Sequence, residues 1–325
     1  MTGVTESSLG EGLALAGPSP AIQTLALSKR FGSVNALTGL SMSVPRGEIF
    51  GFLGPNGAGK TTAIKLLLGL TFPTSGEAFV LGAPIGDREA RRRIGYLPEL
   101  FRYQDWLSAR ELLRFHCRLA GVPAGQRERQ IDSALDTVGL TKRASDRVGS
   151  YSKGMQQRVG LAVAMIGNPE LIFLDEPTSA LDPVGRREVR DVLRGLKARG
   201  VAIFLNSHLL TEVEHVCDRV AIVDRGRVVA IGTLHELMSD EFSVRIRLDG
   251  LSDQFAQALS TYGSVTVEDG CYVLRKLDPD RVPDAVAALI GLGARVRAVE
   301  PWRRSLEDHF LRVLRGSADA AARDR

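Results

Sequence analysis

The sequence has no long apolar run: no stretch approaches the roughly 20 unbroken apolar residues that a membrane-spanning helix requires. It also has little net charge, because 42 basic residues stand against 38 acidic ones and leave +4. That excess is too small to indicate nucleic acid, so we expect no nucleic-acid partner. If the protein works at a membrane, another molecule must hold it there.

Cysteine is scarce, and the three thiols (Cys117, Cys217 and Cys271) are scattered without the spacing of metal ligands. We therefore expect reduced thiols in a cytoplasmic protein. The N-terminal segment lacks the basic start of a secretory signal and is rich in Gly, Ser and Thr. We expect residues 1–20 to form a disordered leader.

What remains is an ordinary globular composition, with 44% apolar and 25% charged residues. Its most informative stretch runs from residue 54 to residue 62 and fits the phosphate-loop pattern G-x-x-x-x-G-K-[ST]. An apolar strand precedes this stretch and a helix follows it, which favours nucleotide binding over a simple glycine-rich turn. The predicted nucleotide-binding residues are Gly54, Pro55, Asn56, Gly57, Ala58, Gly59, Lys60, Thr61 and Thr62.

Each residue type in this loop has a physical task. Glycines let successive N–H groups point inward at one anion, and the following helix adds its positive end. Lys60 can bridge the outer phosphates as a point charge, and Thr61 can hold Mg²⁺ through its hydroxyl.

Strands and helices alternate around this loop as in an α/β fold with a mostly parallel sheet. A mainly helical stretch interrupts the alternation, with a capping box at Ser108 and Glu111, and predicts a helical subdomain at about residues 100–165. We expect one α/β domain over residues 21–238. Its predicted strands are 21–27, 40–44, 48–53, 76–81, 94–97, 171–175, 201–205, 220–223 and 228–231, and its main helices are 108–119, 126–138, 184–198 and 209–216.

The pattern restarts near residue 240 with a β-α-β-β-α-β order, which predicts a small ferredoxin-like α+β domain over residues 241–315. A last amphipathic helix over 306–314 is assigned to this domain, and residues 316–325 are expected to form a disordered tail. A regulatory or dimer-supporting role and a stabilising role are equally open for this domain.

A second chemical motif is the apolar strand 171–174 with two acids at its end. Asp175 stands where a strand end can hold a Mg²⁺-bound water, and Glu176 can polarise an attacking water. An acidic pair that merely solvates the sheet end is the alternative, and the phosphate loop upstream argues against it.

A third motif, residues 151–158, places Ser152 and Gly154 at a helix start, where the alternative is an ordinary N-cap.

Taken together, these motifs resemble those of ATP-binding cassette (ABC) proteins, the ATPase subunits of membrane transporters, over about residues 21–237. The resemblance implies a P-loop NTPase cassette with a mostly parallel sheet, antiparallel strands and a helical subdomain. It gives His208 the role of a switch histidine at the γ-phosphate, with Glu176 and Lys60 as the other catalytic residues. Phe31 would stack on adenine. The implied signature, which faces ATP held by a second cassette, is Ser152, Lys153, Gly154 and Met155, and the implied D-loop contains Ser179 and Asp182.

Two positions depart from the commoner family pattern. Glu99 occupies the usual place of the Q-loop glutamine, where a carboxylate can hold water or Mg²⁺ but adds negative charge. The signature carries Lys153 and Met155 where Gly and Gln are commoner, as in a drug-exporter-like branch whose ATPase is a separate chain. Residues 300–310 are similar to an ending common in that branch, with extra residues after Pro301.

The resemblance implies ATP and Mg²⁺ as cofactors and a homodimer or heterodimer of ATPase subunits. It further implies an integral membrane permease that holds the protein at the cytoplasmic face of the membrane, with export as the direction. Two alternatives are a soluble cassette ATPase acting on ribosomes or nucleic acid and a small-molecule kinase. The apolar residues after Glu99 either contact the permease or pack internally: Leu100, Phe101, Tyr103, Trp106 and Leu107.

Overall fold

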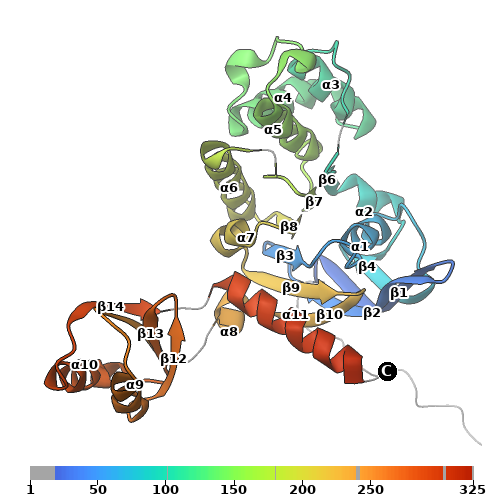
Figure 1. Ribbon diagram of the computed structural model, residues 1–325. Helices are drawn as coiled ribbons and strands as arrows, with labels where there is room; N and C mark the ends of the chain where they lie inside the picture. Colours follow the sequence, from blue (N-terminus) through green and yellow to red (C-terminus); the bar gives the residue numbers. More distant parts are fainter. Residues whose placement is uncertain (1–18, 101, 180, 239–241, 303–304, 324–325) are drawn as a thin grey trace, which may run out of the picture.

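The computed structural model describes residues 19–100, 102–179, 181–238, 242–302 and 305–323, the last with side chains to residue 314 (Figure 1). Most of the expected leader, Phe101 in the apolar segment after Glu99 and Ala180 in the D-loop therefore lie outside the described residues. The architecture is α/β, with parallel and antiparallel strands, as the sequence pattern predicts.

The core of the cassette is a six-stranded sheet in the order β10-β9-β3-β8-β7-β6. Its strands β3, β7 and β8 are buried along their whole length, as expected for parallel strands covered on both faces. Phe50, Phe173 and Phe204 pack together across neighbouring strands. The strands are β3 (Ile49–Leu53), β6 (Ile94–Leu97), β7 (Leu171–Asp175), β8 (Ala202–Asn206), β9 (Arg219–Asp224) and β10 (Arg227–Thr233).

A second, antiparallel sheet in the order β2-β1-β4-β5 packs against the first. The hydrophobic cluster between the two sheets includes Ile22, Leu40, Phe52 and Ile64. The first two strands form a hairpin longer than expected, because their pairing continues, with register shifts, to Phe31 opposite Val34. The strands are β1 (Ile22–Phe31), β2 (Val34–Val44), β4 (Ser75–Val80) and β5 (Ala83–Pro84), the last of which the sequence pattern missed.

Helices cover the sheet and form the projecting subdomain at the top of Figure 1. The predicted capping box is confirmed, since Ser108 accepts a hydrogen bond from the N–H of Glu111 and the Glu111 carboxylate accepts one from the N–H of Ser108. The cassette helices are α1 (Lys60–Leu67), α2 (Arg88–Arg92), α3 (Ala109–Leu119), α4 (Ala124–Thr137), α5 (Lys153–Ala164), α6 (Pro183–Ala198), α7 (Leu210–Val216) and α8 (Leu234–Met238), with short 3₁₀ turns at Thr141–Arg143 and Val148–Ser150.

The C-terminal domain has the expected β-α-β-β-α-β order and an antiparallel sheet in the order β12-β13-β11-β14. Its two helices cover one face of this sheet, and the domain has its own hydrophobic core around Ile246, Tyr272 and Leu289. The elements are β11 (Ser243–Leu248), α9 (Asp253–Ser260), β12 (Ser264–Glu268), β13 (Cys271–Arg275), a 3₁₀ turn (Pro279–Arg281), α10 (Val282–Gly291) and β14 (Val296–Trp302).

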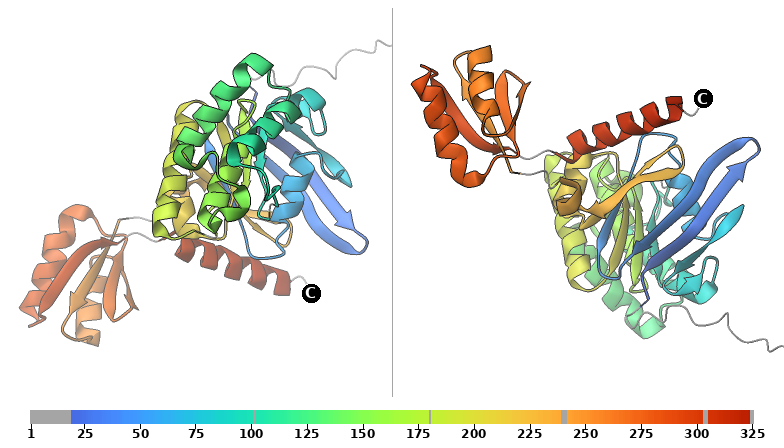
Figure 2. Two further views of the ribbon diagram at one scale, coloured as in Figure 1. Left: turned by 90° about the horizontal axis from the view of Figure 1, so that it is seen from above. Right: turned by 90° about the horizontal axis from the view of Figure 1, so that it is seen from below.

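The last helix corrects two predictions. It runs as α11 over Leu306–Arg323, so residues 316–323 are helical and the tail predicted over 316–325 is wrong there. Its alanine-rich second half explains this, because alanine has the highest helix propensity. The helix also contacts the cassette through α7, α8, β9 and β10, and Figures 1 and 2 show it lying along the cassette while the small domain stands apart. It therefore belongs structurally to the cassette and not to the domain predicted over 241–315.

The packing of α11 predicts a large effect of one substitution. Leu306 is completely buried in the main cassette core, with Phe310 and Val313 against the same core one and two turns later. We expect Leu306→Ala to lower the free energy of unfolding by about 2–4 kcal/mol, since it leaves a cavity. Chemical denaturation measures this. Leu311→Ala on the exposed side of the helix is the control, and equal losses for both variants would contradict the assigned packing.

Two further observations bear on the sequence predictions. In the part of the chain that the structure describes, no helix combines the length and the apolar character needed to cross a bilayer. The three cysteines are all buried and free of disulfides.

Candidate nucleotide-binding and catalytic site

Nine of the predicted site residues meet at a cavity of about 490 Å³: Asn56, Gly57, Gly59, Lys60, Thr61, Thr62, Glu99, Glu176 and His208. This cavity lies at the carboxyl ends of the parallel strands β3, β6, β7 and β8, where open α/β sheets place their ligands. Residues from distant parts of the sequence line it: Val34, Asn35, Ala36, Asn56, Gly57, Gly59, Lys60, Thr61, Thr62, Glu99, Glu176, Asn206 and His208.

The phosphate loop has the backbone that anion binding needs. Gly59 is the N-cap of α1, with φ of 101°, and no side chain caps the first turn of that helix. The free N–H groups of the turn are therefore available to a bound phosphate. A Cβ atom at Gly59 would lie 2.3 Å from the Ala36 carbonyl oxygen, and one at Gly54 would lie 2.3 Å from that of Val223. Both glycines are required by the close approach of neighbouring backbone.

Lys60 is held inside the loop. Its side chain is buried, and Nζ donates hydrogen bonds to the carbonyl oxygens of Gly54 at 2.7 Å and Pro55 at 3.1 Å. Burial lowers the pKa of this ammonium group, while the acids Glu176 and Asp175 oppose the shift. The Lys60 ammonium group thus lies within the phosphate loop, where a bound phosphate can replace its two carbonyl partners.

Asp175 ends strand β7 and is almost fully buried. Burial raises the pKa of its carboxyl group, and a hydrogen bond that Asn206 donates to Oδ1 at 2.5 Å opposes that rise. Asn206 ends the neighbouring strand β8 opposite Asp175, and its backbone oxygen also accepts the N–H of Glu176. Asn206 was not among the site residues predicted from the sequence, and its place just before Ser207 and His208 was the available signal.

Glu176 and His208 form a pair at the cavity. The Nδ1 atom of His208 lies 2.7 Å from Oε2 of Glu176, and the glutamate is buried while the histidine is half exposed. Burial raises the pKa of the Glu176 carboxyl group, and the contact with His208 lowers it by a smaller amount. Glu176 also has a positive φ of 55°, a conformation that is uncommon for non-glycine residues.

The oxygen donors at the cavity suit a hard cation. Thr61 and Glu99 line the cavity, and Asp175 ends β7 immediately before Glu176, which also lines it. Among the described residues, no three His, Cys, Asp or Glu side chains cluster closely enough to form a complete metal site. The arrangement fits Mg²⁺, which takes one or two protein oxygens and completes its shell with water and phosphate oxygens.

Other predicted residues lie outside this cavity. Ser152 caps α5 by accepting the N–H of Met155, so the signature residues Ser152 to Met155 sit at an exposed helix end in the helical subdomain. Asp182 is the N-cap of α6, and the Ser179 hydroxyl donates to the Glu176 carbonyl oxygen. Phe31 is half exposed at the end of β1, with Lys29 Nζ 4.8 Å from its ring centre.

The buried Glu176 predicts a pH dependence of stability. Below its ordinary pKa of 4.5 the carboxyl group is protonated in both the folded and the unfolded chain. As pH rises above 4.5 the unfolded chain ionises first, so the folded state loses stability until pH exceeds the raised folded pKa. Glu176→Gln has no carboxyl group to ionise and so avoids this loss of stability. Its melting temperature should therefore exceed that of the native chain, by a difference that grows as pH rises and then levels off.

Thermal melts of nucleotide-free protein between about pH 4 and pH 8 measure this gap. The exposed Glu77→Gln is the control and should follow the native chain throughout. A gap for Glu176→Gln that closes as pH rises would contradict the proposed effect of burial.

Comparisons with known proteins agree with this geometry. A family profile described as ABC transporter matches residues 37–179. An uncharacterized ABC transporter ATP-binding protein of Synechocystis sp. is 42% identical, over 87% of this chain and 79% of the relative. The Nod factor export ATP-binding protein I of Rhizobium sp. is 36% identical, over 90% of this chain and 96% of the relative.

Among solved structures, one described as the ATP-binding subunit of an ABC transporter superposes with a TM-score of 0.62 at 33% identity, over 67% of this chain and 91% of that chain. The phosphate loop, the acidic strand end and these likenesses lead to one conclusion. The chain belongs to the ABC transporter ATP-binding protein family, whose members bind and hydrolyse ATP.

Proposed function

We propose that this chain pairs with a second ATPase subunit, hydrolyses ATP with Mg²⁺ and drives export through a separate membrane permease at the cytoplasmic face of the membrane. One observation carries the proposal: the cavity gathers Lys60, Glu176 and His208, while the signature at Ser152 lies on a different, exposed helix end. A site whose parts lie on two separate surfaces is completed when two cassettes meet head to tail.

The roles of the residues follow from their positions. Lys60 and the N–H groups of α1 bind the β- and γ-phosphates, and the oxygens of Thr61, Glu99 and Asp175 would hold Mg²⁺ directly or through water. When bound, Mg²⁺ supplies positive charge that offsets the charge developing on the phosphates. Asn206 keeps the Asp175 carboxylate in position.

Glu176 accepts a proton from the attacking water at its carboxylate, and His208 keeps that carboxylate oriented through Nδ1. Its raised pKa suits this task, because a carboxylate with a higher pKa is a stronger base. The partner subunit's signature helix end would face the γ-phosphate with its own free N–H groups. Phe31, at the end of its hairpin, would stack on adenine, and Ser179 and Asp182 would lie near the junction of the two cassettes.

A surface on the helical side suits a permease. Leu100 and Trp106 are 88% and 70% exposed, whereas Tyr103 and Leu107 pack against the cassette core. The internal alternative therefore holds for Tyr103 and Leu107.

A groove of about 450 Å³ between α2 and α3 combines three arginines of α2 with the exposed Leu119. Apolar and basic groups together fit a short helix at the inner membrane surface. The exporter name of the Rhizobium relative supports the direction of transport.

Co-expression with candidate permease subunits encoded in the same genome tests the assignment. The native chain should co-purify with a multi-spanning membrane subunit, and Trp106→Asp should lose that association while still binding ATP. Phe72→Asp changes another highly exposed aromatic residue and should associate normally. Equal retention of both variants would contradict the docking surface. Salt-sensitive binding of nucleic acid without any membrane subunit would instead favour the soluble alternative.

A further inference from the structure

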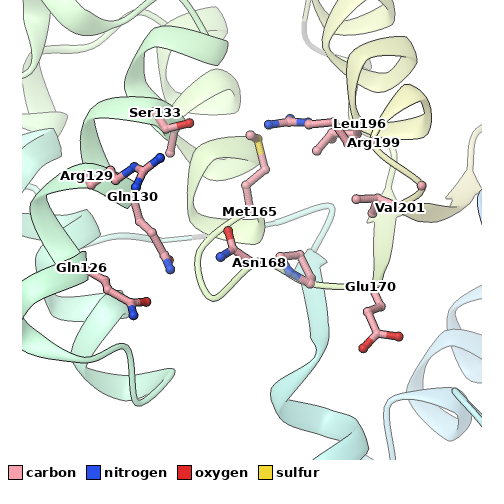
Figure 3. A pocket seen from close by; sticks show the side chains of 13 residues that line it. Gln126, Arg129, Gln130, Ser133, Met165, Asn168, Glu170, Leu196, Arg199 and Val201 are labelled. Atoms are coloured by element: carbon pink, nitrogen blue, oxygen red, sulfur yellow. The ribbon is translucent and has the colours of Figure 1, made fainter.

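A second and larger cavity, of about 700 Å³, lies between the helical subdomain and the α/β core (Figure 3). One wall comes from α4, and the other comes from the end of α6 and the turn that leads into β8. The loop between α5 and β7 lies between them. It is separate from the nucleotide cavity and shares no lining residue with it. It is lined by Gln126, Arg129, Gln130, Ser133, Ala134, Met165, Asn168, Pro169, Glu170, Leu196, Arg199, Gly200 and Val201.

The charge of this cavity is positive. Arg129 stands on the α4 wall and Arg199 follows α6 on the other wall, and both are exposed. Within the described ranges, neither guanidinium group has an ion pair or a side-chain hydrogen bond. The acid in the lining, Glu170, is already held by Arg46 at 2.6 Å and Arg93 at 2.5 Å. The two lining arginines therefore face the cavity without local compensation.

The rest of the lining combines polar donors with apolar side chains. Gln130 Oε1 accepts a hydrogen bond from the backbone N–H of Gly167 at 3.1 Å. The amide NH₂ group of Gln130 can therefore donate hydrogen bonds to a ligand. Asn168 adds a second amide at a position with φ of 54°. Met165, Leu196 and Val201 supply apolar surface. A concave site of this size that combines apolar side chains with charged and polar groups can hold a small organic molecule.

We propose that this cavity binds an organic anion with an apolar body, whose carboxylate, sulfonate or phosphate group is held by Arg129 and Arg199. Charge-assisted hydrogen bonds from guanidinium groups are the strongest that side chains offer to such anions. The apolar body would pack on Met165 and Leu196. Because the two arginines belong to different subdomains, the ligand would join the helical subdomain to the core.

Binding can be followed at the cavity itself. The sequence has 5 methionines, so ¹³C-methyl-methionine labelling gives a simple NMR spectrum, in which a Met165→Leu variant assigns the reporter. We use 2-naphthoate as the probe, with saturating ADP to occupy the phosphate loop. The Met165 signal should shift saturably while that of Met42, buried between the two cassette sheets, stays in place. The uncharged isostere 2-naphthamide should bind at least about tenfold more weakly.

Matched double variants test the arginines. Arg129→Ala with Arg199→Ala should weaken 2-naphthoate binding by at least about tenfold. Arg118→Ala with Lys142→Ala removes the same charge from exposed positions outside the cavity and should leave affinity unchanged. The proposal is overturned if Met165 does not respond to millimolar 2-naphthoate. It is equally overturned if both double variants bind alike, because the affinity would then owe nothing to the two cavity arginines.

Discussion

A Lys60→Ala variant should lose at least about a hundredfold in ATP affinity, because it removes a charge-assisted contact to two phosphates at once. The lysine is buried within the phosphate loop and already bonds to the carbonyl oxygens of Gly54 and Pro55. Its removal leaves these two carbonyls to face the nucleotide with no intervening cation. Isothermal titration with ATP and Mg²⁺ measures the loss, and ATPase turnover should disappear with it.

Lys65→Ala is the matched control, since Lys65 is an exposed lysine on the same helix. Its variant should bind ATP like the native chain. A Lys60→Ala protein that binds ATP normally would show that the loop does not hold the phosphates through this residue, and the assignment of the cavity would fail with it.

A Glu176→Gln variant should bind ATP and hydrolyse it at least about a hundredfold more slowly, because an amide cannot accept the proton of the attacking water. The substitution preserves shape, and the amide oxygen can still accept from His208. If cleavage is what separates two cassettes, the variant should also accumulate as an ATP-bound dimer. Phosphate release measures the first effect, and light scattering with and without ATP measures the second.

Glu77→Gln is again the control, as an exposed glutamate remote from the cavity lining. It should hydrolyse ATP at the native rate and show no excess of dimer. Normal turnover by Glu176→Gln would remove the glutamate from its proposed role. Slow turnover without any dimer would keep that role but contradict the pairing of two cassettes.

Much of this arrangement follows from local sequence signals. The strand over 171–175 was predicted with the bounds that the structure has, because four apolar residues followed by an acid have few alternative readings. The phosphate loop was recognisable because glycine, lysine and threonine each answer a separate requirement of phosphate binding. The β-α-β-β-α-β order of the small domain was readable for the same reason, since each element is short and bounded by turn residues.

The remaining features depend on contacts between distant residues. Asn206 reaches Asp175 across 31 positions of sequence, and that contact exists only because β7 and β8 are neighbours in the sheet. Tyr103 and Trp106 are both aromatic residues of one segment, yet the first is partly buried against the cassette core and the second is exposed. Local pattern cannot distinguish them, because the helical subdomain decides which ring is covered. The contact of α11 with the cassette has the same origin.

The placement of α11 has a practical consequence for dissecting the protein. The small domain is spliced into the cassette between α8 and α11, and both flanking helices pack on cassette strands. Cutting the chain after α8 would therefore remove the helix that covers the cassette surface around β9 and β10. It would also remove the backbone N–H of Leu306, which donates a hydrogen bond to the Glu214 carboxylate. To delete the small domain without this loss, one must remove β11 to β14 and connect α8 to α11 with a short flexible linker.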